Sequence, residues 1–162
     1  MRIGVISDTH IPEKALGLPE KVVKDLKKVD MIIHAGDLIA LSVIDMLKNI
    51  CPNVKAVYGN MDPWEIRENL PEKEIIKIKK HRIGITHGHG HPHYIIETVK
   101  KTFQKDKVEV IIFGHSHQPL NEERDGILYF NPGSLTDKIF APYNSYGIIE
   151  INDTIKAWIV RI

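Results

Sequence analysis

Five apolar runs rich in valine and isoleucine each end at a short polar cluster, and this spacing constrains the fold more than any other feature. The runs are Arg2–Ile6, Met31–Ala35, Val54–Tyr58, Arg82–Thr86 and Val108–Phe113. Short apolar runs bounded by turn residues are typical of buried strands. Because the carboxyl ends of parallel strands meet at one edge of a sheet, the polar residues after these runs are expected to meet there.

Amphipathic segments alternate with the first three runs. Pro19–Lys28 and Leu41–Lys48 carry apolar residues on one side and charged residues on the other, which predicts two helices. The resulting β-α-β-α-β order predicts a parallel sheet with right-handed crossovers. A third helix is predicted to begin at Pro63, with Asp62 as its N-cap and Glu65 three residues beyond the cap.

The second half of the chain is richer in strand patterns. Glu74–Ile78 and Arg82–Thr86 predict a hairpin that turns at Lys79–His81, and Tyr94–Lys105 predicts a helix. The remaining predicted strands are Ile127–Phe130, Ser145–Ile151 and Thr154–Arg161. We therefore expect residues 1–162 to form a single α/β domain in which two mixed sheets pack as a sandwich flanked by helices.

The charge balance argues against a dedicated nucleic-acid-binding protein. The net charge is +1 and the lysines are scattered, whereas nucleic-acid binders usually carry a broad basic face.

No apolar stretch approaches the roughly 18 residues that a membrane helix requires. Cys51 is the only cysteine, and Met1 leads directly into the first run without a signal peptide. We expect a cytoplasmic protein without membrane contact, and the formation of a homo-oligomer stays open.

Aspartate and histidine dominate the first, second and last polar clusters. Asp8 and His10 are two residues apart in chain that we expect to be extended, so their side chains can point the same way. His115 and His117 repeat this spacing. Asp37 follows a glycine, and its two carboxylate oxygens can bridge two cations. Such a set of ligands is what a two-metal hydrolase needs.

The middle clusters add an amide and further imidazoles. Asn60 offers a neutral oxygen ligand, although a turn residue is the alternative. His87, the histidine nearest to its strand, is the expected ligand from the histidine-rich segment 87–93. His89 is either a proton donor or substrate-binding residue near the metals, or an exposed loop histidine. Ligation by Asp, Asn and His suits manganese, iron, cobalt, nickel or zinc, and the absence of sulfur disfavours a structural zinc site.

The clusters occur in the order found in the calcineurin-like metallophosphoesterases, which the chain resembles. The motifs are Asp8-x-His10, Gly36-Asp37, Gly59-Asn60-x-Asp62, His87-Gly88 and Gly114-His115-Ser116-His117, supported by Asn131-Pro132-Gly133-Ser134. The sequence looks most like the small archaeal and bacterial phosphodiesterases of this superfamily. The family fold, an αββα sandwich of two mixed sheets flanked by helices, agrees with the pattern of predicted elements.

The resemblance implies a dinuclear metal centre. One metal would be bound by Asp8, His10, Asp37 and His117, and the other by Asp37, Asn60, His87 and His115, with Asp37 bridging. The implied reaction is phosphoester hydrolysis, in which a metal-bridged hydroxide attacks phosphorus in line. The expected cofactors are two divalent transition metal ions, with manganese as the expected metal. Asn60 and His89 are the expected catalytic residues.

One position departs from the family pattern. Many members carry a histidine directly after the motif asparagine, where it contacts the phosphate or protonates the leaving oxygen, whereas this chain has Met61. A thioether can do neither at neutral pH. A dianionic monoester would suffer most from this loss. We therefore expect a small phosphodiester as substrate, and more diesterase than monoesterase activity.

Two other functions stay open. The small retromer subunit has the same fold and looks like a protein-binding scaffold with an altered metal site. This chain keeps Asp37 and Asn60 in the form that two metals require, which favours an enzyme. A nuclease would need a basic groove with stacking aromatic side chains. Trp64 and Tyr94 could stack on bases, but residues of these types more often pack in a core.

Overall fold

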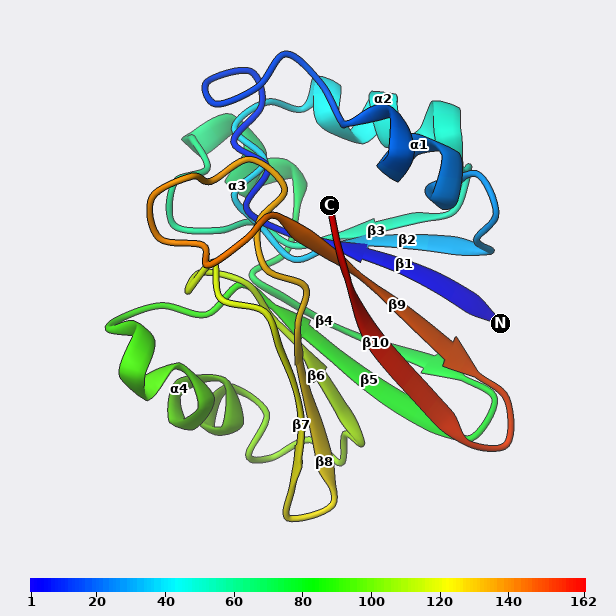
Figure 1. The fold of residues 1–162 in the computed structure, drawn as a ribbon. Coiled ribbons are helices and arrows are strands. Elements are labelled where there is room, and N and C mark those ends of the chain that lie inside the picture. Colours follow the sequence, from blue (N-terminus) through cyan, green and yellow to red (C-terminus); the bar gives the residue numbers. More distant parts are fainter.

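The computed structural model describes residues 1–162, which form two five-stranded sheets packed face to face (Figure 1). The first sheet contains, in spatial order, β10 (Ile155–Arg161), β9 (Ser145–Ile151), β1 (Arg2–Ile6), β2 (Met31–His34) and β3 (Val54–Ala56). The second contains β4 (Lys73–Ile78), β5 (His81–Thr86), β6 (Val110–Ile112), β8 (Ile127–Asn131) and β7 (Leu120–Arg124). The predicted sandwich of two mixed sheets is therefore confirmed.

Each sheet has three parallel strands at its centre or along one side. β1, β2 and β3 are parallel, with Ile3 paired to Met31 and Ile32 paired to Val54. In the second sheet β5, β6 and β8 are parallel as well. The remaining strands, β9, β10, β4 and β7, pair antiparallel with their neighbours. As expected, the β-α-β-α-β pattern of the first half produces a parallel sheet.

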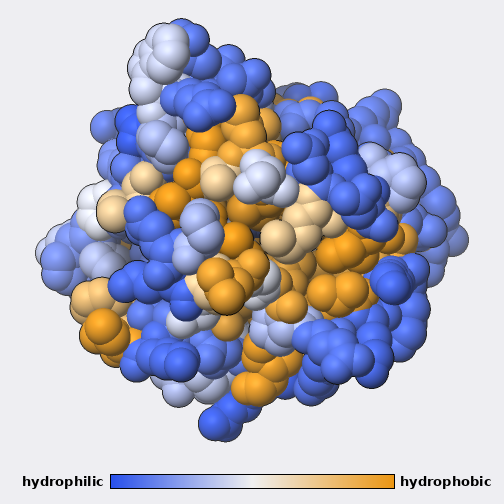
Figure 2. Space-filling model, turned by 90° about the horizontal axis from the view of Figure 1, so that it is seen from above, coloured by the Kyte–Doolittle hydropathy of each residue, from blue (hydrophilic) through white to orange (hydrophobic).

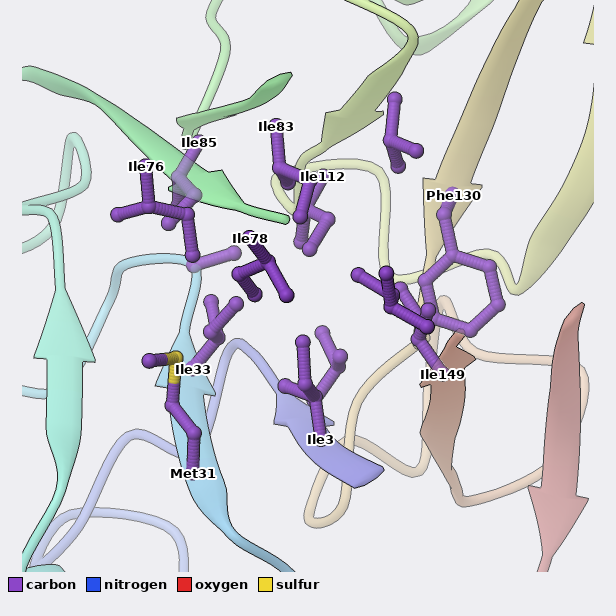
Figure 3. Close-up of a cluster of buried hydrophobic side chains, with 14 of the residues drawn as sticks. Ile3, Met31, Ile33, Ile76, Ile78, Ile83, Ile85, Ile112, Phe130 and Ile149 are labelled. Atoms are coloured by element: carbon purple, nitrogen blue, oxygen red, sulfur yellow. The ribbon is translucent and has the colours of Figure 1, made fainter. Parts of the chain in front are cut away.

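The core between the sheets is built mainly from isoleucine. Ile33 of the first sheet and Ile83 and Ile112 of the second belong to one cluster of 15 buried residues (Figure 3). These β-branched side chains suit a pleated, fully buried surface. The runs that looked like strands in the sequence are therefore the inner layer of the sandwich.

Helices cover the outer faces of both sheets. Helices α1 (Glu20–Leu26), α2 (Ser42–Ile50) and α3 (Trp64–Asn69) each place buried apolar side chains in a second core against the first sheet. Helix α4 (Ile95–Thr102) follows the 3-10 turn η1 (Pro92–Tyr94) and covers the second sheet. The face that carries α1 and α2 shows apolar surface in its middle and hydrophilic surface around it (Figure 2). None of the helices has the length and apolarity needed to cross a membrane.

Three local predictions differ from the structure. Strand β7 was not predicted, because its sequence Leu-Asn-Glu-Glu-Arg is polar and lies exposed at a sheet edge. His81 is not a turn residue: it begins β5, and its buried ring bonds to Glu109. The last helix spans Ile95–Thr102 and ends three residues before the predicted Lys105, because the backbone N–H groups of Phe103 and Gln104 bond to carbonyls three residues back and close tight turns.

Candidate metal centre

The loops after five parallel strands bring the seven predicted ligands together. Asp8 and His10 follow β1, Asp37 follows β2, Asn60 follows β3, His87 follows β5, and His115 and His117 follow β6. The first sheet thus supplies four of these residues and the second supplies three. The predicted meeting point at the carboxyl ends of the strands therefore exists, and it lies where the two sheets adjoin.

One side of the site, which we call the buried half-site, consists of Asp8, His10 and His117. Each offers a ligand atom, and these atoms lie within 4.8 Å of one another. Oδ1 of Asp8 is 3.2 Å from Nε2 of His117. Atoms that are each bound about 2.0–2.2 Å from one cation lie at comparable separations. Asp8 is fully buried and His10 is 6% exposed, so this half-site is shielded from solvent.

The other side, the open half-site, consists of Asn60, His87 and His115. Oδ1 of Asn60 is 2.7 Å from Nδ1 of His115 and 3.2 Å from Nε2 of His87. Asn60 is exposed, whereas His87 is buried. The side chains of this half-site therefore meet at the solvent-facing surface of the site.

Asp37 lies between the two half-sites. Its Oδ2 is 3.3 Å from Nε2 of His87 and 3.9 Å from Nε2 of His10. Its Oδ1 accepts a hydrogen bond of 2.8 Å from the backbone N–H of Met61. The bridging position predicted for Asp37 therefore has a physical basis, but a single oxygen faces both half-sites, rather than one oxygen facing each.

Backbone carbonyls fix the ring orientation of both histidines of the open half-site. Nδ1 of His87 donates to the carbonyl of Ala35 at 2.7 Å, and Nε2 of His115 donates to the carbonyl of Gly90 at 2.7 Å. When such a ring is neutral, as a metal ligand must be, its other nitrogen is an acceptor that faces the amide oxygen of Asn60. Lone pairs that converge in this way fit a shared cation.

The buried half-site shows the same pattern with a carboxylate. Nδ1 of His117 donates to Oδ2 of Asp137 at 2.6 Å, which leaves Nε2 directed at Asp8. Nε2 of His10 is buried and has no hydrogen-bond partner. A buried polar atom without a partner costs free energy unless something else binds it. The donor set therefore fits divalent transition metals, which imidazole and carboxylate ligands bind well.

Backbone strain is concentrated in these loops. Five of the eight non-glycine residues with positive φ are predicted ligands: Asp8 (52°), His10 (45°), Asp37 (58°), His115 (67°) and His117 (56°). The chain around Asp8 and His10 is therefore not extended, as we had expected. Nor do His115 and His117 point the same way, since they serve opposite half-sites. Strain of this kind commonly collects at functional sites.

Carboxylates and imidazoles shift one another's pKa strongly. Burial raises the pKa of Asp8, but His87 and His117 outweigh burial and lower it to about 2. Burial lowers the pKa of His87, but Asp8 and Asp37 outweigh it and raise it to about 9. His117 behaves alike: burial is outweighed by Asp8 and Asp137, and its pKa rises to about 9. Without metal, protonated histidines thus balance the buried carboxylates.

Comparison with known proteins places the chain in a family. Residues 1–154 match the calcineurin-like phosphoesterase superfamily domain. The chain belongs to this superfamily. A probable metallophosphoesterase of Methanocaldococcus jannaschii is 37% identical over 163 residues, which cover 100% of this chain and 82% of that protein. A phosphodiesterase of the same organism is 32% identical over 142 residues, which cover 82% of this chain and 83% of that protein.

Solved structures share the fold of this phosphoesterase domain. Wild-type Vps29 from Entamoeba histolytica, solved in complex with Zn²⁺, is 26% identical, with a TM-score of 0.78 and 99% coverage of both chains. The phosphoesterase fold expected from the resemblance is therefore confirmed. Members of the superfamily bind divalent metals, and two groups of residues could hold an ion here: Asp8 with His10 and His117, and Asp8 with Asp37 and His87.

The role expected for Asp62 in this phosphoesterase is wrong. Asp62 is not a helix cap, since α3 begins after Pro63 without a side-chain cap. The Asp62 carboxylate is instead buried and accepts hydrogen bonds from the backbone N–H groups of Asp37, Ile39 and Gly59. It thereby ties the loop of Asp37 to the loop of Asn60.

Sequence reasoning also missed residues that support the ligands. Asp137, in the loop after β8, orients His117 and was not predicted. No pattern in the neighbouring sequence marked it; the hydroxyl of Ser134, three residues earlier, accepts the backbone N–H of Asp137. The same hydroxyl donates to the carbonyl of Asp8, and Asn131 donates to the carbonyl of Gly114. The segment 131–134 thus supports the loop of Asp8 and the loop that begins at Gly114.

A cleft of about 570 Å³ opens over the predicted ligands. Its lining includes five predicted ligands (His10, Asp37, Asn60, His115 and His117) together with Glu13, Lys14, Met61, Ser116, Gln118, Ile139 and Phe140.

His89 is exposed and lines a neighbouring hollow that shares only Asn60 with the cleft, so its catalytic role stays a prediction. Trp64 and Tyr94 do not pack in the core: they are 72% and 61% exposed, and neither lines the cleft.

Proposed function

We propose that the chain is a metal-dependent phosphodiesterase that uses two divalent transition metal ions, with manganese as the expected metal. The proposal is carried by the convergence of seven oxygen- and nitrogen-bearing side chains from both sheets, with three histidines oriented from outside the site. When bound there, two such ions supply activation of a water nucleophile and neutralisation of phosphoryl charge. The single, buried Cys51 is compatible with the reducing cytoplasm, where we place the protein.

The chain's own residues bind the ions and orient the substrate. Asp37 faces both half-sites through one oxygen and would serve as a ligand in both. Asn60, exposed to the cleft, serves as a ligand and positions the phosphate at the open half-site. Lys14 is the only lysine or arginine that lines the cleft, and its charge attracts the anionic substrate.

The cleft suits a phosphodiester better than a monoester. Met61 lines it and is 55% exposed, so the position next to Asn60 supplies no proton to a leaving group. A diester carries one negative charge and a monoester two, and Lys14 is the single lysine or arginine in a lining that also includes Glu13. The second charge of a monoester would therefore meet no further lysine or arginine in the cleft.

The decisive experiment combines metal analysis with matched aryl phosphates. We expect two metals per chain and faster hydrolysis of bis(4-nitrophenyl) phosphate than of 4-nitrophenyl phosphate, with both metal and activity lost in Asp37→Ala. Met61→His should raise the monoester rate relative to the diester rate, whereas the control Met61→Leu should leave the ratio unchanged. A monoester preference in the metal-loaded wild type would contradict the proposal.

A protein-binding scaffold is the second candidate, because the likeness to Vps29 extends over nearly the whole chain. The same experiment separates the two. A wild-type protein that binds no metal and turns over no phosphoester would favour the scaffold, whereas retained metal and diesterase activity would exclude a purely structural role.

A further inference from the structure

Large apolar side chains are exposed around an otherwise polar site. Ile139 is 76% exposed, Phe140 is 70% exposed and Met61 is 55% exposed, and all three line the cleft over the predicted ligands. Exposed apolar side chains that gather at a cleft mark a binding surface. Metal binding does not explain them, since none of the three can ligate a hard or borderline cation through a hydrocarbon side chain or a thioether.

The Ile139–Phe140 segment is fixed relative to the metal centre by one carboxylate. Oδ2 of Asp137 accepts from Nδ1 of His117 at 2.6 Å and from the backbone N–H of Phe140 at 3.0 Å. Oδ1 of Asp137 accepts from the backbone N–H of Ile139 at 2.9 Å. The ring of Phe140 consequently lies 6.2 Å from the ring of His117, nearly perpendicular to it at 73°. A group attached to a phosphate at the metals would therefore meet this ring.

The cleft has room for such a group. At about 570 Å³ it lies within the range of small-molecule sites, which is far more than a phosphate needs. The lining of the cleft also includes the polar side chains of Glu13, Ser116 and Gln118. A phenylalanine ring with hydrogen-bonding groups nearby suits a flat aromatic ligand with polar edges better than an alkyl chain.

We propose that Ile139 and Phe140, with Met61, form the subsite for the organic substituent of the phosphodiester, and that this substituent is a flat aromatic group. The inference rests on the proposed function and specifies its substrate class. Asp137 then has two roles: it orients His117, and it fixes the Ile139–Phe140 segment against which the substituent packs.

The test measures ligand binding without turnover. Isothermal titration calorimetry compares methylphenylphosphinate with dimethylphosphinate on the metal-loaded protein, since both carry the single charge of a diester, contain no ester bond to hydrolyse and differ in one substituent. We expect the wild type to bind methylphenylphosphinate about tenfold more tightly, as expected for burying an aromatic ring. Phe140→Ala should reduce this preference to about twofold, and Ile139→Ala should reduce it partly.

Trp64→Ala is the matched control, because Trp64 is as exposed as Phe140 but lies outside the cleft. It should keep the full preference for methylphenylphosphinate. The inference is overturned, while the proposed function stands, if the wild type shows no preference or if Phe140→Ala keeps the preference. The exposed side chains of Ile139 and Phe140 would then be better explained as a surface that a protein partner covers. If the wild type binds neither ligand, the proposed function fails as well.

Discussion

The two half-sites of the metal centre hold similar side chains in different surroundings. In the buried half-site, Asp8 is fully enclosed and His117 is oriented by the carboxylate of Asp137. In the open half-site, Asn60 is exposed and the histidines are oriented by backbone carbonyls. Besides Asp37, which faces both, the first has the carboxylates of Asp8 and Asp137, whereas the second has the neutral amide of Asn60. We therefore expect the buried half-site to bind an ion more tightly than the open one.

The largest expected effect comes from removing what the half-sites share. Asp37→Asn should keep the shape of the side chain but lose the charge on Oδ2, which faces both halves. We expect diesterase activity to fall by about 10³-fold or more, because groups that act as a unit fail together. Elemental analysis should find fewer than two metals per chain. A variant that retains both metals and normal kcat would refute the shared role of Asp37.

The next effect isolates the buried half-site. Asp137→Asn should weaken binding of one ion by about 10- to 100-fold, the usual cost of losing the carboxylate behind a metal-bound histidine. Titration of the metal-free protein with Mn²⁺, followed by electron paramagnetic resonance, should show the tighter of two binding events weakened. If only the weaker event changes, the assignment of tight binding to the buried half-site is wrong.

The pH dependence of metal binding probes both halves. The pKa values of His87 and His117 are about 9 without metal, so at pH 7 each ring carries a proton that an ion must displace. Lowering the pH should therefore weaken binding, by up to about tenfold per pH unit for each proton released. Binding should stop improving above pH 9. Calorimetry in buffers of different ionisation enthalpy would count the protons, and an affinity independent of pH between 6 and 9 would contradict the expectation.

The smallest effect concerns the open half-site alone. Arg67 donates to the backbone carbonyls of Asn60 at 2.7 Å and Asp62 at 2.8 Å, and so steadies the loop that presents Asn60. Because Arg67 is exposed, Arg67→Gln should weaken the second, weaker binding event only severalfold. The tighter event should stay unchanged in the same titration. Weakening of both events would show that the two half-sites do not behave separately.

The sequence predicted which side chains meet at the site because strand ends are encoded locally. Apolar runs and the polar residues after them are contiguous, so the meeting of Asp8, Asp37 and His87 could be expected without a structure. The groups that orient these ligands were not predictable in this way. Asp137 reaches His117 across 20 residues, and the carbonyl of Ala35 reaches His87 across 52. Such partners depend on tertiary packing and leave no pattern in the nearby sequence.

The local geometry of the loops was also beyond the sequence. An Asp-x-His spacing allows both an extended and a left-handed backbone, and only the packed loops select the left-handed one. Asp62 illustrates the same limit, because Asp-Pro before an amphipathic segment is a normal helix start. Its burial between two loops, with three backbone N–H groups directed at it, overrode the local preference.

Because the ligands come from both sheets, the metal centre also joins the two halves of the sandwich. The chain has a single cysteine and therefore no internal disulfide, so bound ions would act as reversible cross-links between the two sheets. An ion present at 100 times its Kd adds about 2.7 kcal/mol to the free energy of unfolding. The thermal midpoint of unfolding should therefore rise with metal concentration. Removal of the metal in a cell would lower the stability of the protein as well as its activity.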